Sequence, residues 1–237
     1  MNKIGYKKVL LKLSGEMLLG NQDKGIDFEV LEELCGVIKD VQDSGVKVGI
    51  VLGAGNIWRY RDSKDSKIAR VKSDQIGMMG TIINALAMAG KLESMGAKAA
   101  AFSAIEVPDV CETYTVRRAA QLFDEGQIVV LAGGTGNPFF TTDSAAALRA
   151  LELGCDALLK GTKVEGIYDS DPVKNPDAKF YKTITFSEVL EKDLKVMDAA
   201  AISLCRDNNM PVKVFSIQDF GNIKRVVEGE DIGSTVQ

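Results

Sequence analysis

The chain has 237 residues, a formal net charge of −4 and no histidine. The lack of histidine excludes Ser-His-Asp and Cys-His catalysis and every metal site that needs an imidazole, so any proton transfer must use carboxylates, lysine or tyrosine. The hydrophobic content of 46% and charged content of 26% are typical of a soluble globular protein, and the small negative charge gives no general attraction to nucleic acid or an anionic membrane.

Strand patterns and helix patterns alternate along the chain. Buried strands are expected at residues 9–13, 46–52, 98–103, 128–132, 157–160 and 212–215, with an edge strand near residue 234. Helices are expected from the N-cap residue Asp27 to Gly45, and at 73–95, 116–123, 142–153, 187–190 and 198–208. The polar segment 169–182 is expected to form a loop or a hairpin. The alternation predicts an α/β fold, a three-layer αβα sandwich with a mostly parallel central sheet of roughly eight strands.

The composition indicates a single domain over residues 1–237, because the chain has only five prolines and no repeat or low-complexity run. Residues 1–14 do not resemble a signal peptide, and no segment is long enough to cross a bilayer. The four cysteines are far apart in sequence, which favours free thiols over a disulfide framework. We therefore expect a cytoplasmic protein that binds neither nucleic acid nor a membrane.

Two of the expected strands end in loops that are rich in glycines, hydroxyl groups and charges. The strand at 128–132 is followed by residues 133–143, and the strand at 157–160 is followed by the polar run 161–172. The carboxyl ends of parallel strands meet at one edge of a sheet, and ligands bind at that edge. Both loops are therefore expected to contribute to one site, and their chemistry favours phosphate.

The glycines of residues 133–143 leave backbone N–H groups that can form a nest for an anion. Thr141 and Thr142 stand at the expected start of a helix, where free N–H groups and the helix dipole attract phosphate. Asp143 is unusual beside a phosphate. It either provides a favourable charge for the helix dipole or holds nearby lysines or a metal, and the sequence does not decide between these two roles.

Lys12 and Lys160 are each preceded by Leu-Leu near the end of an expected buried strand. A buried lysine is costly unless it meets an anion, and two ammonium groups at one edge suit a transferring phosphoryl group. The alternative is that each lysine pairs with a structural carboxylate. Gly15, which follows Lys12 closely, permits close approach of the backbone to a ligand.

Residues 53–59, Gly-Ala-Gly-Asn-Ile-Trp-Arg, follow a strand and resemble half of a dinucleotide-binding fingerprint. The fingerprint requires Gly or Ala where Trp58 stands. Asp74 has the spacing of its acidic residue but lies in a helix rather than after a second strand. A nicotinamide site is therefore rejected, and so is a P-loop, since no GxxxxGK[ST] is present. The remaining interpretations are a phosphate-facing turn with Arg59, or a tight turn beside a surface arginine.

Taken in order, these motifs resemble the amino acid kinase superfamily and, within it, most closely the bacterial UMP kinase family. The resemblance covers essentially the whole chain, from Lys12 to Val227. Its most specific part is Thr-Gly-Asn-Pro-Phe-Phe-Thr-Thr-Asp at 135–143, which matches that family's acceptor loop. Residues 159–168 and 188–197 support it.

The resemblance implies transfer of the γ-phosphoryl group of ATP to UMP, giving UDP for pyrimidine nucleotide biosynthesis, with Mg²⁺ as the cofactor and no metal ligand assigned to the protein. It implies catalytic roles for Lys12, Arg59, Asp143 and Lys160, with Lys12 on the transferring group and Asp143 organising the lysines and the metal region. No base is needed if the acceptor phosphate is already ionised. The implied ATP site consists of Lys12, Leu13, Ser14, Gly15, Gly55, Arg59, Thr162, Lys163, Tyr168 and Asp171.

The resemblance also implies a UMP site in which Asp74 accepts hydrogen bonds from the ribose hydroxyls. That site consists of Ala54, Asp74, Thr135, Gly136, Asn137, Pro138, Phe139, Phe140, Thr141 and Thr142. A candidate allosteric region matches one linked to GTP activation in bacterial relatives, and it consists of Gly20, Asn21, Gln22, Asp23, Lys24 and Gly25. The family further implies a homohexamer, with GTP and UTP as effectors.

Two residues depart from the family pattern. Ala54 stands where the family has a glycine, so its methyl group is expected to crowd the UMP phosphate, and Tyr60 stands where a glycine is common. The main rival interpretation is a superfamily member that acts on a carboxylate, a carbamate or an isoprenoid phosphate. Isopentenyl phosphate kinases rely on a histidine that is absent here, and aspartate or acetylglutamate kinases lack the run at 137–142. A rival of another class is a regulator that binds ATP without turnover.

Overall fold

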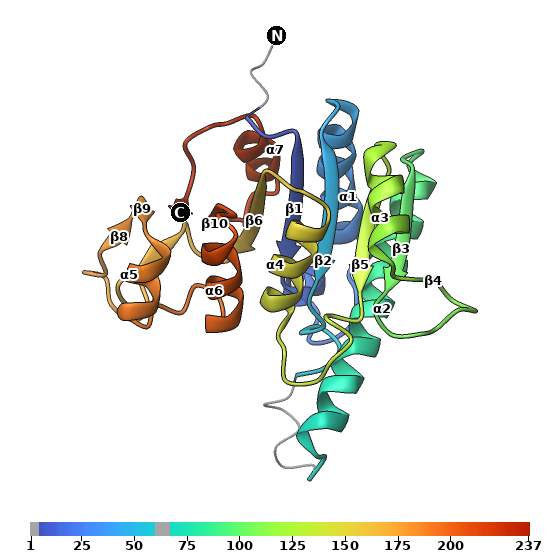
Figure 1. Cartoon of the computed structure of the whole chain (residues 1–237), viewed down its shortest axis with the longest axis horizontal. Helices are drawn as coiled ribbons and strands as arrows, with labels where there is room; N and C mark the ends of the chain where they lie inside the picture. Colours follow the sequence, from blue (N-terminus) through green and yellow to red (C-terminus); the bar gives the residue numbers. More distant parts are fainter. Residues whose placement is uncertain (1–4, 60–66) are drawn as a thin grey trace.

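The structure is a computed structural model that describes residues 5–59 and 67–237. One central sheet contains β1 (Lys8–Leu13), β2 (Lys47–Leu52), β3 (Ala99–Ser103), β4 (Glu112–Thr113), β5 (Ile128–Ala132), β6 (Ala157–Thr162), β9 (Thr183–Ile184), β10 (Val212–Ser216) and β11 (Ser234–Val236). The strand order is β4-β3-β5-β2-β1-β6-β10-β11-β9 (Figure 1). Neighbouring strands run parallel except for β10 and β11, which are antiparallel.

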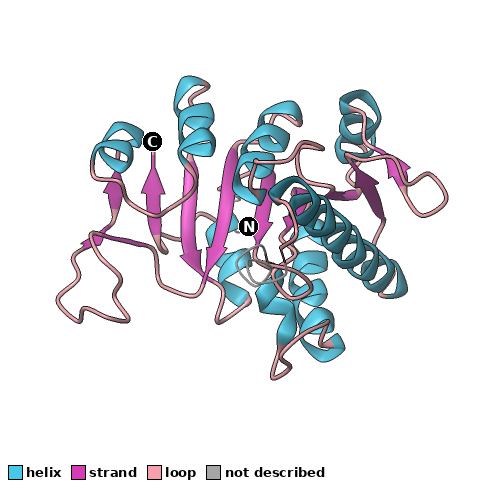
Figure 2. Ribbon diagram, turned by 90° about the horizontal axis from the view of Figure 1, so that it is seen from below, coloured by secondary structure: helices cyan, strands magenta, loops and turns pink. Residues whose placement is uncertain are grey.

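Helices cover both faces of this sheet (Figure 2). One hydrophobic core contains buried residues of α1 (Phe28–Asp43), α2 (Arg70–Ser94) and α7 (Gly221–Val227). The second core contains buried residues of α3 (Val116–Asp124), α4 (Thr142–Glu152), α5 (Phe186–Glu191) and α6 (Ala199–Asp207). The three-layer αβα sandwich that the alternating pattern predicts is confirmed.

The central strand β1 shows how the sequence divides between the two cores. Val9, Leu11 and Leu13 pack in the core with α1, whereas Leu10 packs in the core with α4. Side chains alternate across a strand, so Lys12 lies on the same face as Leu10. This face is the one that α4 covers, and the placement brings the ammonium group of Lys12 to the start of that helix.

The number and the order of the strands differ in detail from the sequence-based expectation. The sheet has nine strands in the described residues rather than about eight. The strand near Ser234 was expected at the edge, and that expectation is wrong because the two-residue strand β9 pairs outside β11. The polar segment 169–182, expected to form a loop or a hairpin, follows β7 (Ile167–Tyr168) and contains β8 (Phe180–Tyr181), and these two strands pair as a hairpin.

Helix starts were predicted well where a side-chain cap marks them. Asp27 caps α1 by accepting hydrogen bonds from the N–H groups of Glu29 and Val30. By contrast, α2 begins at Arg70 rather than at Ser73, after Ala69, which provides no side-chain cap. The short 3₁₀ helix η1 (Gly15–Leu19) and α7 were not expected.

Candidate active site

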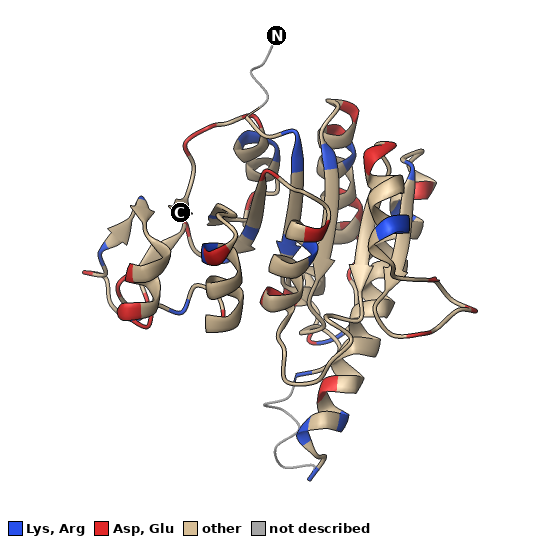
Figure 3. Cartoon of the chain, in the orientation of Figure 1, with Lys and Arg blue, Asp and Glu red and all other residues tan. Residues whose placement is uncertain are grey.

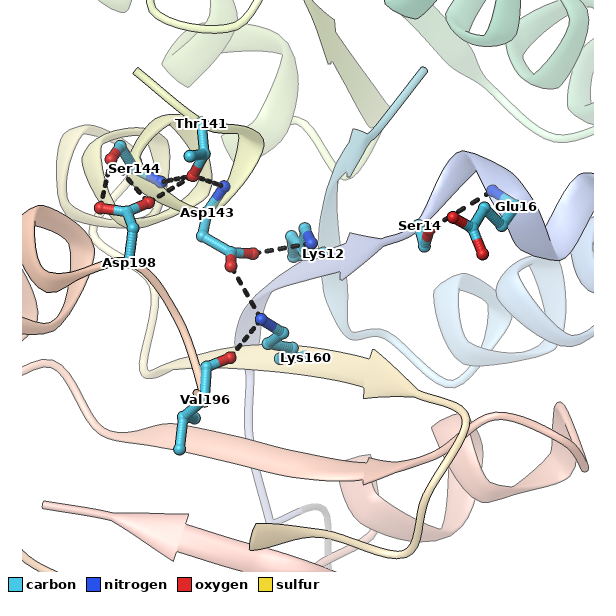
Figure 4. A network of polar contacts seen from close by, with 9 residues as sticks. All are labelled: Lys12, Ser14, Glu16, Thr141, Asp143, Ser144, Lys160, Val196 and Asp198. Atoms are coloured by element: carbon cyan, nitrogen blue, oxygen red, sulfur yellow. Dashed lines mark hydrogen bonds and ion pairs between the residues drawn. The ribbon is translucent and has the colours of Figure 1, made fainter. Parts of the chain in front are cut away.

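Lys12 and Lys160 are direct neighbours in the sheet. The parallel strands β1 and β6 pair in a register that places Lys12 opposite Lys160. Each lysine lies near the carboxyl end of its strand and points toward the start of α4 (Figure 4). The expectation that both ammonium groups converge on one edge of the sheet is confirmed.

Asp143, in the first turn of α4, lies between the two lysines. Its Oδ1 is 2.7 Å from Nζ of Lys12, and its Oδ2 accepts a hydrogen bond of 2.8 Å from Nζ of Lys160. Oδ1 accepts no hydrogen bond from the described residues, so the contact with Lys12 is an ion pair without hydrogen-bond alignment. Asp143 therefore holds both lysines, which is one of the two roles that the sequence left open.

This triad is buried but carries unequal charge. The side chains of Lys12, Lys160 and Asp143 are 12%, 13% and 15% exposed. With both lysines protonated, the three groups sum to one positive charge. Each lysine does meet a carboxylate, as the structural alternative required, but that one carboxylate leaves positive charge that a further anion can neutralise.

The pKa directions in the triad follow from this arrangement. Burial alone would raise the pKa of the Asp143 carboxyl, but the charges of Lys12 and Lys160 and the hydrogen bond from Lys160 outweigh it and hold the pKa below its usual value. Burial lowers the pKa of Lys160. The charge of Asp143 opposes that shift, and the charge of Lys12 adds to it.

Asp198, the N-cap of α6, binds the start of α4, the helix that carries Asp143. It was not predicted as a site residue. Its carboxylate accepts hydrogen bonds from the hydroxyls of Thr141 and Ser144 and from the N–H of Ala201. Nζ of Lys160 also donates to the carbonyl of Val196, close to this cap. The sequence marks Asp198 only as a helix start, because its partners on α4 come together with it only in the folded chain.

Two clefts lie on either side of the triad. The first, of ≈ 480 Å³, is lined by Lys160 and by three residues expected at ATP, namely Thr162, Tyr168 and Asp171. The second, of ≈ 360 Å³, is lined by Lys12 and by most residues expected at UMP. The residues expected at UMP that line it are Ala54, Asp74, Thr135, Asn137, Phe140, Thr141 and Thr142. We call them the donor cleft and the acceptor cleft.

The turn after β2 is locked against the start of η1. A Cβ atom on Gly15 would lie 2.3 Å from the carbonyl oxygen of Gly53 and 2.4 Å from Oδ1 of Asn56. The close approach that Gly15 permits is therefore to this turn. Asn56 and Asn84 exchange reciprocal hydrogen bonds of 2.9 and 2.8 Å, which fix the turn to α2. Ser14 and Gly55 line the acceptor cleft, although they were expected at ATP.

Arg59 is held by Glu16 rather than left at the surface. Its guanidinium lies 3.0 Å from Oε1 of Glu16, and its Nε donates to the carbonyl of Gly55 at 2.7 Å. Lys163, which is 75% exposed, pairs with the other oxygen of Glu16 at 3.0 Å. Glu16 thus forms ion pairs with Arg59 and Lys163, both of which were expected at ATP. Glu16 itself was not predicted as a site residue.

The acceptor loop, residues 133–141, uses much of its own hydrogen-bonding capacity. The glycines at 133, 134 and 136 all have positive φ, as the nest interpretation requires. However, the N–H of Gly133 donates to Thr81 and the N–H of Gly136 donates to Gly133. The N–H groups of Asp143 and Ser144 are capped by the Thr141 hydroxyl. The expectation of an open row of peptide donors is therefore only partly met.

Asp74 lies in α2 and reaches the acceptor loop. Its Oδ2 accepts a hydrogen bond of 2.8 Å from the N–H of Phe139, and both of its oxygens lie 2.8 Å from Nε of Arg70. Phe139 and Phe140 are exposed. Arg70 also lines the acceptor cleft and was not predicted as a site residue.

Ala54 is accommodated by a glycine on α2. A Cβ atom on Gly80 would lie 2.9 Å from the Ala54 methyl group, so the helix has no side chain where that methyl packs. Tyr60, the other departure from the family pattern, lies outside the described residues. The candidate allosteric region at 20–25 is joined to this turn because Gly25 exchanges two hydrogen bonds with Asn56, of 3.0 and 2.8 Å.

Neither a metal-binding cluster nor a membrane-spanning helix is found in the described residues. Across residues 5–59 and 67–237, no three His, Cys, Asp or Glu side chains form a cluster that could hold a metal ion. No helix in these same ranges is both long and apolar enough to cross a membrane. Lys and Arg are interspersed with Asp and Glu over the elements (Figure 3).

The sequence matches the amino acid kinase family model over residues 7–216. It is 50% identical over 229 residues to the uridylate kinase of Methylococcus capsulatus, an alignment that covers 97% of this chain and 96% of that one. It is 48% identical over 237 residues to the uridylate kinase of Xanthomonas oryzae pv. oryzae, covering 100% and 99%. The crystal structure of UMP kinase from Bacillus anthracis superposes with a TM-score of 0.95 at 38% identity, covering 98% and 96%.

Replacing Asp143 with asparagine tests the energetic role of the triad. Asp143→Asn leaves two buried ammonium groups without their anion and should lower the free energy of unfolding by roughly 3–5 kcal/mol, measured by urea denaturation at pH 7. Asp124 provides a matched control, since it also pairs with two lysines, at 2.9 and 2.8 Å, but is 55% exposed. Asp124→Asn should cost less than about 1 kcal/mol, and equal losses would contradict the role assigned to burial.

The difference between the wild type and Asp143→Asn should also depend on pH. The pKa of Asp143 is lowered in the folded protein, so its contribution is complete above the usual carboxyl pKa and is lost as pH falls through the lower folded value. The stability difference should therefore be constant near neutrality and shrink below about pH 4.

Proposed function

We propose a residue-level mechanism for this chain from the premise that it belongs to the amino acid kinase family, as a UMP kinase that transfers the γ-phosphoryl group of ATP to UMP and yields UDP and ADP. The observation that carries the proposal is that the Lys12–Asp143–Lys160 triad joins two clefts, because each of its lysines lines one of them. Lys160 lines the donor cleft and Lys12 lines the acceptor cleft. A phosphoryl group that passes from one cleft to the other would meet both ammonium groups.

The chemistry needs positioning and charge neutralisation rather than a base. An oxygen of the UMP phosphate is already ionised and attacks the γ-phosphorus of ATP, while the bond from that phosphorus to the β–γ bridging oxygen breaks and ADP leaves. Negative charge spreads over the equatorial oxygens of the transferring group. Lys12 and Lys160 neutralise it, and Asp143 keeps their ammonium groups in place before the nucleotides bind.

On the donor side, we assign the adenosine of ATP to the cleft lined by Thr162, Tyr168 and Asp171. The ring of Tyr168 packs edge-on against Phe180 at 5.2 Å, which fixes one wall of this cleft. The ATP phosphates would extend from there toward the segment 12–15, Gly55 and the cations held by Glu16. Those cations, Arg59 and Lys163, would exchange contact with Glu16 for contact with phosphate.

On the acceptor side, we assign the ribose of UMP to Asp74 and the rest of the nucleotide to the acceptor loop and Ala54. The Asp74 side chain is 13% exposed and faces the acceptor cleft. A carboxylate can accept hydrogen bonds from two vicinal hydroxyls. The hydroxyls and amides of residues 135–142 suit a uracil ring, which presents both hydrogen-bond donors and acceptors.

We propose Mg²⁺ as the cofactor, carried by the phosphates of ATP. Mg²⁺ keeps several waters and is usually bound through substrate phosphates and one or two carboxylates. Such a site fits a chain whose described residues contain no acidic cluster, with Asp143 as the nearby carboxylate. When bound, the ion would neutralise phosphate charge together with the lysines.

The assembly and its regulation are further proposals. We infer a cytoplasmic homohexamer of single-domain chains. Support comes from α2, where the large apolar side chains of Ile76, Met79 and Ile83 are exposed at helical spacing and suit burial against a second copy. We infer that GTP and UTP act as effectors. The region 20–25 is a candidate for transmitting the GTP signal, since Gly25 is hydrogen-bonded to Asn56 beside the phosphate turn.

A coupled assay with ATP, Mg²⁺ and UMP, CMP or dTMP tests the proposed mechanism against a regulator that only binds nucleotides. The wild type should form UDP from UMP. Lys12→Ala should lower kcat by about 10²–10³-fold, because it removes a charge that acts on the transition state, while the dissociation constant for UMP changes little. Near-normal turnover by Lys12→Ala would exclude its assigned role, and tight ATP binding without any transfer by the wild type would favour the regulator.

The lowered pKa of Lys160 predicts an alkaline limb in the rate profile. As pH rises through that pKa, which lies below the usual 10.5, Lys160 loses its charge and kcat/KM for ATP should fall. Lys160→Arg should be slower but should lose this limb, because a guanidinium stays protonated. Lys174→Arg, at a side chain that is 84% exposed, should keep the wild-type profile. An unchanged alkaline limb in Lys160→Arg would contradict the assignment.

A further inference from the structure

Arg70, Asp74 and Phe139 contact one another beside the acceptor cleft. Nε of Arg70 lies 2.8 Å from each oxygen of Asp74, and the N–H of Phe139 donates to Oδ2 of the same carboxylate at 2.8 Å. The Arg70 guanidinium lies 5.7 Å from the centre of the Phe139 ring, within the range of a cation–π contact. These contacts join the first turns of α2 to the acceptor loop.

The positions of Arg70 and Asp74 are not explained by a contribution to the stability of α2. Arg70 is the first residue of the helix, where the positive end of the dipole disfavours a cation. The acid follows the base by four residues, which is the less favourable order for such a pair on a helix. The first turn contains no acidic residue, and its N-cap provides no side-chain hydrogen bond. The pair therefore stabilises the helix less than the reverse order would, and its contacts with the loop opposite account better for its position.

Phe139 has a backbone that needs external support. Its φ is 72°, in the left-handed region that a side chain other than glycine or asparagine rarely adopts. Phe139 is 66% exposed, so burial of its side chain does not compensate for that conformation. Such a residue persists only where its surroundings fix it. The contacts with Asp74 and Arg70 provide that constraint.

We propose that Arg70 is a positioning residue for the acceptor nucleotide. It orients the Asp74 carboxylate and, through Phe139, holds the acceptor loop against α2 before UMP binds. The proposal rests on the role proposed above for Asp74, as the acceptor of hydrogen bonds from the ribose hydroxyls. An ionised carboxylate has about four lone-pair directions. Arg70 takes one on each oxygen and Phe139 takes a third, which leaves one direction for the 2′-hydroxyl.

Steady-state kinetics of Arg70→Gln with UMP and 2′-deoxy-UMP test this role. With Asp74 no longer oriented, KM for UMP should rise on the order of tenfold, as expected for the loss of a charge-assisted hydrogen bond. The preference for UMP over 2′-deoxy-UMP is measured as the ratio of the two kcat/KM values. It should fall severalfold, because the Asp74 carboxylate is no longer oriented to accept the hydrogen bond of the 2′-hydroxyl. The kcat with UMP and the KM for ATP should stay within about twofold of wild type.

Lys72→Gln is the matched control, because it removes the same charge from the same turn of α2. Lys72 is exposed and its Nζ donates to Gln75 at 3.2 Å, without contact to Asp74. This variant should retain wild-type KM values and the wild-type preference for UMP. If Lys72→Gln and Arg70→Gln weaken UMP binding equally, the effect is general electrostatics and the positioning role is wrong.

Arg70→Lys and Asp74→Asn separate the remaining possibilities. Arg70→Lys keeps the charge and the aliphatic stem but lacks the planar guanidinium. It should therefore keep the thermal midpoint of the wild type and recover part of the preference for UMP. Full recovery would contradict a need for guanidinium geometry.

Asp74→Asn should abolish most of that preference. If it does not, the ribose role of Asp74 is wrong and the inference falls with it. If it does, while both Arg70 variants keep the wild-type preference, only the inference about Arg70 is contradicted.

Discussion

The structure depends on the burial of two ammonium groups around one carboxylate. Lys12 and Lys160 occupy paired positions on adjacent parallel strands, and Asp143 at the start of α4 contacts both, at 2.7 and 2.8 Å. Burying charge is costly unless the groups are paired and hydrogen-bonded. One carboxylate satisfies most of that requirement and leaves one positive charge over. The same imbalance makes the edge of the sheet receptive to an anion, so a feature that is unfavourable for the folded chain alone becomes favourable once phosphate is bound.

Much of the surrounding architecture keeps this triad in place. The register of β1 and β6 sets the spacing of the lysines, and the cap that Asp198 shares with Thr141 and Ser144 fixes the start of α4 against α6. Two further sets of contacts hold the walls of the acceptor cleft. The reciprocal amide pair of Asn56 and Asn84 fixes the turn after β2, and the Arg70–Asp74–Phe139 set fixes the acceptor loop. The chemistry then needs no group that changes its protonation state, which suits a chain without histidine.

The sequence predicted the sandwich and the convergence of the lysines because both follow from local rules. Buried strands read as continuous apolar runs, and parallel strands share a carboxyl edge. It did not reveal Asp198 or Glu16 as site residues, since their partners are distant in sequence and meet them only after folding. Arg70 was missed because α2 has no side-chain cap, so its start was placed at Ser73. The open nest of peptide donors was overestimated, because the glycine pattern cannot show that Thr81 accepts the N–H of Gly133.

The most direct test of the central claim is a crystal structure with UMP and a non-hydrolysable ATP analogue bound together. The account predicts the two nucleotides in separate clefts, with oxygens of the terminal phosphate within about 3.2 Å of Nζ of both Lys12 and Lys160 and with Asp143 still in contact with both. A terminal phosphate bound away from both lysines, or both nucleotides in one cleft, would contradict it.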